Sequence, residues 1–277
     1  MAAEIHPTAV IEPGAVIGDG ARIGPFCMVG PQVVLGANVH LIGHVTVLGQ
    51  TTIGEGTKVY PQAVLGCDPQ NHGHKGGPST LEIGRNNTIR EGVTMHTGTD
   101  TARARTTVGD NCHFLGYSHV AHDCAVGNNV TMTQGAVLGG HCEVGDFAIL
   151  GGLSAVHQFV RIGHHAFVGG MSGLERDLIP YGMVTGNRGR LRGLNVVGMR
   201  RSGVSRDDMK ALRAAYKMMF NPARPVLENI PLVQQSFAGI AIVDDLLAFM
   251  TERGRRQFVM PAVGGRASGD DGVDGEA

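Results

Sequence analysis

Residues 5–40 consist of six consecutive hexapeptides: IHPTAV, IEPGAV, IGDGAR, IGPFCM, VGPQVV and LGANVH. Each hexad begins with an aliphatic residue, and glycine follows that residue in four of the six. A six-residue period matches neither the 3.6-residue repeat of a helix nor the two-residue alternation of a strand. It is typical of a parallel β-helix, a solenoid in which short strands are joined by tight turns.

The same frame covers 26 hexads, all with an apolar first residue. We predict three hexads to a coil, so that each first residue points inward and stacks on its equivalent one coil later, with coils about 4.8 Å apart. Glycine after the first residue is expected to relieve crowding at corners where a positive φ is needed. The first residues are Ile5, Ile11, Ile17, Ile23, Val29, Leu35, Leu41, Val47, Ile53, Val59, Leu65, Ile83, Ile89, Met95, Val108, Phe114, Val120, Val126, Met132, Leu138, Val144, Leu150, Val156, Ile162, Val168 and Leu174.

Two segments leave this frame, residues 68–80 and residues 97–107. Loops that protrude from a flat-sided solenoid can form the walls of a cleft. The alternative is that they are insertions without a function. We predict a β-helix over 1–187 and a helical domain over 188–260 that covers the open end of the solenoid. Within that domain Ser205 begins a helix through a capping-box pattern. The tail, 261–277, is expected to be disordered.

The composition excludes several classes of function. The net charge of −1 gives no reason to expect a nucleic-acid partner or an anionic membrane surface. No apolar run approaches the length of a transmembrane segment, and the N-terminus does not have the pattern of a signal peptide. The five cysteines are odd in number and lack a CxxC pair, which indicates reduced thiols and a cytoplasmic location.

Histidines gather in one part of the repeat. His122 is the third residue of its hexad and His141 is the fourth residue of a hexad one coil later, so the two are predicted to lie near one corner. His157 follows on the next coil. Histidine is the side chain best suited to take a proton at neutral pH. A stabilising polar ladder along the corner is the structural alternative.

The histidine corner suits acyl transfer to a hydroxyl group. His122 is expected to act as general base, with Asp123 orienting it and stabilising the imidazolium. The N–H of Gly140 is expected to stabilise the oxyanion of the tetrahedral intermediate. No serine or cysteine stands in a recognisable nucleophile pattern, so direct transfer without an acyl-enzyme is favoured.

Two other classes remain open on the residues alone. One is a zinc enzyme like the γ-carbonic anhydrases, with His119, His122 and His141 as ligands. The other is a scaffold without catalytic activity.

The strings HVAHDC at 119–124 and VHQF at 156–159, together with the hexads, the two loops and Gly186-Asn187, carry a family likeness. Over residues 1 to about 220 the chain resembles the bacterial UDP-N-acetylglucosamine O-acyltransferases. The resemblance implies a left-handed coil and a homotrimer with active sites between neighbouring prisms. It implies transfer of an (R)-3-hydroxyacyl chain from acyl carrier protein to the 3-hydroxyl of UDP-N-acetylglucosamine, the first step of lipid A biosynthesis. Neither a metal nor a cofactor beyond the carrier's phosphopantetheine is implied.

The resemblance also implies roles for individual residues. The family's general base falls on His122, its adjoining aspartate on Asp123 and its oxyanion-hole glycine on Gly140. Gly170 falls where the depth of the acyl chain is limited, and a glycine there implies a fairly long chain. The remaining substrate-binding positions implied are Gln70, Asn71, His96, His119, His141, His157, Gln158, Asn195 and Arg201.

Four positions depart from the family pattern. Asn71 stands where the family has an aspartate, Gly73 where it has a lysine, Val197 where it has a glutamate and Ser202 where it has a second arginine. All four belong to the nucleotide-sugar side, so a 3-amino analogue of the sugar, giving an amide product, is an alternative acceptor.

The residues also indicate the donor. Nine lysines and arginines between Arg188 and Lys217, against Asp207 and Asp208, are expected to attract an acidic acyl carrier protein and the diphosphate.

Overall fold

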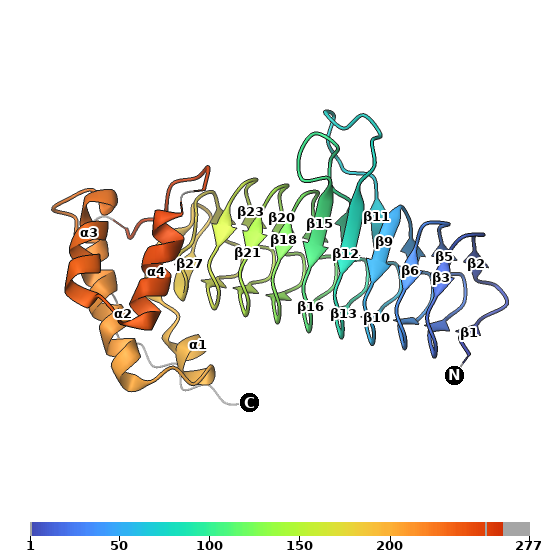
Figure 1. The fold of residues 1–277 in the computed structure, drawn as a ribbon, viewed down its shortest axis with the longest axis horizontal. Helices are drawn as coiled ribbons and strands as arrows, with labels where there is room; N and C mark the ends of the chain where they lie inside the picture. The colour runs from blue at the N-terminus through green and yellow to red at the C-terminus, as the bar shows by residue number, and fades with distance from the viewer. Residues whose placement is uncertain (1, 253, 263–277) are drawn as a thin grey trace.

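A computed structural model describes residues 2–252 and 254–262 (Figure 1). Three parallel sheets form the sides of a left-handed β-helix, and helices α1 to α4 pack at its C-terminal end. The fold class predicted from the hexads is confirmed. No helix among the described residues is both long and apolar enough to cross a membrane.

Each side of the solenoid is one sheet, whose strands come from every third hexad. The first sheet contains β1 (Glu4–Ile5), β4 (Arg22–Ile23), β7 (His40–Leu41), β10 (Lys58–Val59), β13 (Thr88–Ile89), β16 (His113–Phe114), β19 (Thr131–Met132), β22 (Ile149–Leu150), β25 (Phe167–Val168), β27 (Gly182–Thr185) and β28 (Arg190–Leu194). The second contains β2 (Val10–Ile11), β5 (Met28–Val29), β8 (Thr46–Val47), β11 (Val64–Cys67), β14 (Thr94–His96), β17 (His119–Val120), β20 (Val137–Leu138), β23 (Ala155–Val156) and β26 (Gly173–Leu174). The third contains β3 (Val16–Ile17), β6 (Val34–Leu35), β9 (Gln50–Ile53), β12 (Thr80–Ile83), β15 (Arg105–Val108), β18 (Ala125–Val126), β21 (Glu143–Val144) and β24 (Arg161–Ile162).

The core consists of columns of hexad first residues. Ile23 pairs in register with Leu41, 18 residues later, and Leu41 pairs with Val59. From Ile23 to Leu174 these residues are at most 4% exposed. The fifth residues of the hexads, such as Ala21, Val33 and Val39, are buried beside these columns, so that a core without tryptophan is built almost entirely from aliphatic side chains.

The corners differ from the prediction in one respect. The positive φ angles fall at the fourth residue of most hexads, as at Asn38, Asp123 and His141, whereas among the described glycines that follow a first residue only Gly66 has one. That glycine is needed for another reason. A Cβ added at Gly24 would collide with the carbonyl oxygen of Ile42 in the next coil. At Gly24 the second position therefore needs glycine because neighbouring coils approach closely, while the fourth position bears the left-handed turn.

The two segments that leave the frame form loops on one side of the solenoid (Figure 1). Residues 68–79 connect β11 to β12, and residues 97–104 connect β14 to β15. The second loop is shorter than predicted, because Arg105–Val108 already pairs with β12. Where the loops are inserted, paired residues lie further apart in sequence, as Val59 and Ile89 do.

The boundary predicted at residue 187 is too early, because β28 pairs antiparallel with β27 and extends the sheet to Leu194. The helices that follow are α1 (Val196–Arg201), α2 (Arg206–Met219), α3 (Val226–Phe237) and α4 (Ala241–Thr251). Ser205 caps α2 as predicted, accepting from the N–H of Asp208 at 3.0 Å. Helix α3 was not predicted, and it has Pro231 in its interior and no side-chain cap.

Helix α4 is attached to the solenoid through Arg161, which a buried ion pair with Asp177 holds in place. Arg161 donates to Asp177 at 2.9 Å and to the carbonyl oxygen of Phe249 in α4 at 3.1 Å. Of the predicted disordered tail, residues 263–277 lie outside the described chain. Pro261 does not fit that prediction, because it bridges to Leu191.

We expect Gly24→Ala to lower the free energy of unfolding by an amount on the order of 3 kcal/mol, measured as a lower urea midpoint, because the added methyl forces two coils apart. Gly116→Ala is the matched control, since its Cβ would lie 3.5 Å from the nearest atom and its φ is not positive. Equal midpoints for the two variants would contradict the requirement for close approach.

Candidate active site

The centre of the histidine cluster lies at the corner after β17. Residues 122 and 123 connect β17 to β18, and His141 occupies the equivalent corner one coil later, between β20 and β21. Asp123 and His141 both have left-handed backbones, with φ of 60° and 63°. Aspartate and histidine are among the residues that adopt this conformation most readily. The prediction that His122 and His141 share one corner agrees with this geometry: their ring centroids are 5.0 Å apart.

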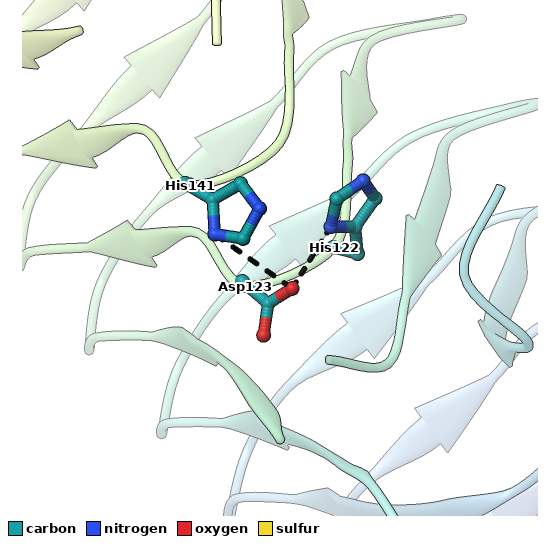
Figure 2. Close-up of side chains that lie close together, drawn as sticks. All are labelled: His122, Asp123 and His141. Atoms are coloured by element: carbon teal, nitrogen blue, oxygen red, sulfur yellow. Dashed lines mark hydrogen bonds and ion pairs between the residues drawn. The ribbon is translucent and has the colours of Figure 1, made fainter. Parts of the chain in front are cut away.

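Asp123 is buried and fully engaged in hydrogen bonds. One carboxylate oxygen lies 2.9 Å from Nδ1 of His122 and accepts from Oγ1 of Thr99 at 2.8 Å (Figure 2). The N–H of Thr99 donates to the carboxylate at 3.1 Å. Burial alone would raise the pKa of Asp123, but the hydrogen bonds from His122 and Thr99 lower it below its ordinary value. The structure therefore holds a carboxylate anion beneath the histidines.

This anion fixes the tautomer of His122. Because ionised Asp123 only accepts hydrogen bonds, Nδ1 of His122 carries a proton, and in the neutral imidazole Nε2 then presents a lone pair. That lone pair faces Nδ2 of Asn71, 3.5 Å away on the first loop. His122 is 4% exposed, and its Nε2 faces the first loop. The arrangement suits proton abstraction by Nε2.

Gly140 lies directly against the His122 ring. A Cβ at this position would be 2.5 Å from Cε1 of His122, so the imidazole occupies the space that a side chain would fill. Within the described chain the N–H of Gly140 has no hydrogen-bond acceptor. Glycine therefore combines room for the base with a free donor beside it, as the oxyanion role requires.

His141 is held from the opposite side by an aromatic residue that sequence reasoning missed. Phe159, one coil further on, stacks on the His141 ring with centroids 4.3 Å apart and planes 4° from parallel. Nδ1 of His141 lies 3.8 Å from Asp123, and burial lowers its pKa. The stack follows from the repeat, because the fourth residues of hexads one coil apart lie above one another.

His96 and His119 form a second pair beside the first. Their rings meet edge to face at 5.2 Å, and Nδ1 of His119 lies 2.7 Å from Oγ1 of Thr94. Burial, assisted by His96 and His122, lowers the pKa of His119 to about 4. His119 is therefore neutral at pH 7. Gln70 and His96 line the same cavity, between the first loop and the solenoid.

His157 and Gln158 mark the outer end of the cluster, where the chain returns after α4. Arg256 lies 2.7 Å from Nδ1 of His157 and donates to the carbonyl oxygen of Gln158 at 3.0 Å. The guanidinium of Arg255 lies over the Phe159 ring, 4.5 Å from its centroid. Nothing in the hexad pattern indicated these arginines, because their approach depends on the packing of the helical domain.

Three predicted site residues lie elsewhere in the chain. Asn195 caps α1, accepting from the N–H of Gly198 and donating to the carbonyl oxygen of His165, both at 2.9 Å. Arg201 is exposed in the last turn of α1, at the end of the solenoid far from the two loops (Figure 1). Gly170 lies next to Gly152, whose carbonyl oxygen is 3.3 Å from where a Cβ would stand. Within one chain, none of the three joins the His122 cluster.

The structure does not bring together His119, His122 and His141, the three ligands of the zinc alternative. Among the described residues, the metal-ligating atoms within 4.8 Å of one another come from His122, Asp123 and His141. His119 is not in this set. Within residues 2–252 and 254–262, a site of three histidines, as in the γ-carbonic anhydrases, is therefore not assembled.

Comparisons with known proteins agree with this geometry. The profile of the bacterial transferase hexapeptide (six repeats) matches residues 2–31 and 105–140, and that of UDP N-acetylglucosamine O-acyltransferase, domain 2, matches residues 177–258. The acyl-(acyl-carrier-protein)–UDP-N-acetylglucosamine O-acyltransferase of Rhizobium etli is 52% identical over 214 residues, 77% of this chain and 79% of that protein. Its counterpart from Bartonella henselae is 48% identical over 211 residues, 76% of this chain and 77% of that protein. The chain belongs to this family.

The solved structures of the UDP-N-acetylglucosamine O-acyltransferase family match almost the whole fold. The crystal structure of the Moraxella catarrhalis protein has a TM-score of 0.89 and 37% identity, and the match covers 92% of this chain and 99% of that one. The family resemblance predicted from HVAHDC, VHQF and the hexads is thereby confirmed.

The low pKa of His119 predicts a pH dependence of stability. The folded chain keeps His119 neutral down to about pH 4, whereas the unfolded chain binds a proton near pH 6.5. Stability is therefore lost as the pH falls from 6.5 towards 4, with a slope of up to about 1.4 kcal/mol per pH unit. Urea midpoints measured between pH 7 and pH 5 should fall less for His119→Asn than for the unaltered chain. Parallel losses in the two proteins would contradict this assignment.

Proposed function

We propose that this chain transfers an (R)-3-hydroxyacyl group from acyl carrier protein to the 3-hydroxyl of UDP-N-acetylglucosamine, the first step of lipid A synthesis. It is an acyltransferase, as its relatives at about 50% identity are named. The observation that carries the mechanism is the His122–Asp123 pair, with an ionised, buried carboxylate on Nδ1 and with Nε2 facing Asn71 of the first loop.

The reaction then proceeds in one transfer. Nε2 of His122 takes the proton of the sugar hydroxyl while that oxygen bonds to the thioester carbonyl carbon. The resulting oxyanion accepts a hydrogen bond from the N–H of Gly140, and Asp123 stabilises the imidazolium. When the carbon–sulfur bond breaks, the leaving thiolate takes the proton from Nε2. The chain needs no cofactor of its own, since the acyl group arrives on the carrier's phosphopantetheine.

The 3-amino analogue of the sugar is not favoured as acceptor. The relatives are named O-acyltransferases. Asn71, which stands against the base, is an uncharged amide and offers no attraction for a protonated amine. Its Nδ2 is placed to donate to the oxygen of a hydroxyl group.

The carrier protein is expected to dock on the basic segment between Arg188 and Lys217. All nine lysines and arginines of this segment are exposed. Lys210 pairs with Asp207 at 3.1 Å. The excess of positive charge suits an acidic partner and raises its association rate.

We propose a homotrimer in the cytoplasm. Asn195 and Arg201 belong to α1 and its cap, at the end of the solenoid far from the two loops (Figure 1). A substrate that contacts these residues as well as a His122 cluster must therefore lie between two chains. Five free cysteines, four of them buried, fit a reducing compartment. Sedimentation equilibrium should give about three times the 29.1 kDa of one chain. A monomeric mass would overturn the shared site.

The activity is tested by measuring transfer from 3-hydroxyacyl carrier protein to UDP-N-acetylglucosamine and, in parallel, to its 3-amino analogue. We expect the hydroxyl sugar to be acylated, and His122→Ala to lower kcat about 1,000-fold because the base is lost. His113→Ala, at an exposed strand residue of the same solenoid, serves as control. Transfer to the amino sugar alone would identify that sugar as the acceptor. Undiminished transfer by His122→Ala would refute the role of His122 as general base.

A further inference from the structure

Asp100, in the second loop, binds the first loop at several points. Its carboxylate accepts from the N–H of Gly77 at 2.9 Å and from the N–H of Lys75 at 3.2 Å, and it lies 3.1 Å from Nδ1 of His74. A Cβ at Gly77 would lie 2.6 Å from the Cβ of Asp100, so glycine is needed for this approach. Hydrogen bonds from Gly77 and Lys75 lower the pKa of Asp100, which therefore binds as an anion.

The residue before Asp100 is tied to the centre of the site. Thr99 donates both its N–H and its hydroxyl to Asp123, the carboxylate that orients His122. Its carbonyl oxygen accepts from the N–H groups of Ala102 and Ala104, so the second loop turns tightly at this point. Asp100 is therefore fixed relative to the general base through its own backbone.

The first loop carries Asn71 to the other side of His122. Oδ1 of Asn71 accepts from the N–H of Gly73 at 2.7 Å, and its carbonyl oxygen accepts from the N–H of His74 at 3.1 Å. This turn leaves Nδ2 of Asn71 to face Nε2 of His122. The turn ends at His74, where Asp100 begins to bind.

We propose that Asp100 is a positioning residue: by fastening residues 74–77 to the second loop, it holds Asn71 against Nε2 of His122 and so sets the acceptor side of the site. The contacts form a closed ring, from His122 through Asp123, Thr99 and Asp100 to the first loop and back through Asn71. This inference rests on the proposed function, because it assigns the acceptor hydroxyl to the space between Asn71 and His122. Asp100 itself touches neither the base nor the substrate.

The fastening is tested without substrate by limited trypsin digestion, with cleavage after Lys75 mapped by mass spectrometry. Asp100→Ala should cleave at Lys75 about tenfold faster than the unaltered chain, because the freed loop is open more often. Asp100→Asn keeps one acceptor oxygen, so its cleavage rate at Lys75 should lie between those of Asp100→Ala and the unaltered chain. The control is Asp110→Ala, which removes an aspartate that also accepts from a backbone N–H, that of Arg85, but at a corner away from the loops. An unchanged rate at Lys75 in Asp100→Ala would overturn the proposal.

The link to the acceptor is tested by kinetics on the same variants. Asp100→Ala should raise KM for UDP-N-acetylglucosamine about tenfold and leave KM for the acyl donor nearly unchanged, with Asp100→Asn partly restoring the acceptor KM. If Asp100 acts through Asn71, the double variant with Asn71→Ala should have the KM of Asn71→Ala alone. If the two substitutions instead raise KM by the product of their separate factors, Asp100 does not act through Asn71. The two proposals can fail separately. If Asp100→Ala is cleaved faster at Lys75 but the unaltered chain transfers no acyl group, the role of Asp100 in holding the first loop is supported and only the proposed function is refuted.

Discussion

The structure depends on one constraint, the stacking of each hexad on its equivalent in the next coil. Backbone hydrogen bonds between coils hold this stack, as where Gly24 donates to Leu41 and Arg22 to Val39, both at 2.8 Å. Side chains at equivalent positions are therefore brought into contact whether or not packing favours them. That is why Asp123, His141 and Phe159, which are far apart in sequence, form one column at one corner. The active-site cluster is a by-product of the same regularity that builds the core.

Placing a carboxylate in this column has an energetic cost, because burying a charge is unfavourable unless it is paired. The chain offsets that cost with the N–H and hydroxyl of Thr99, from the second loop, and with Nδ1 of His122, the preceding residue of the same hexad. Thr106 adds support by accepting from the N–H of Asp123 at 2.8 Å. The solenoid thus supplies the position of the charge, while the second loop supplies much of its stabilisation.

The hexad frame predicted the fold and the meeting of His122 with His141, because both follow from counting residues along a fixed period. It could not predict Thr99 beside Asp123, since the loop that carries Thr99 leaves the frame. Arg255 and Arg256 were missed because their return to the solenoid depends on how the helical domain packs. The prediction for the glycines was correct in part. Crowding at the second residue of the hexad was predicted, but the left-handed turn lies at the fourth residue. The resemblance assigns Asn195 to substrate binding, and the hexad frame could not predict that its side-chain amide also caps α1.

The loops at 68–79 and 97–104 also bear on how such a chain can change over time. A residue inserted within a hexad would move every later side chain off its column, whereas residues added between β11 and β12, or between β14 and β15, leave the columns intact. Asn71 lies on one of these tolerant segments, and His122, Asp123 and Gly140 lie on the intolerant frame. Mutation can therefore remodel acceptor recognition while the acyl-transfer chemistry stays fixed, and divergence among such enzymes should concentrate in the sugar they accept.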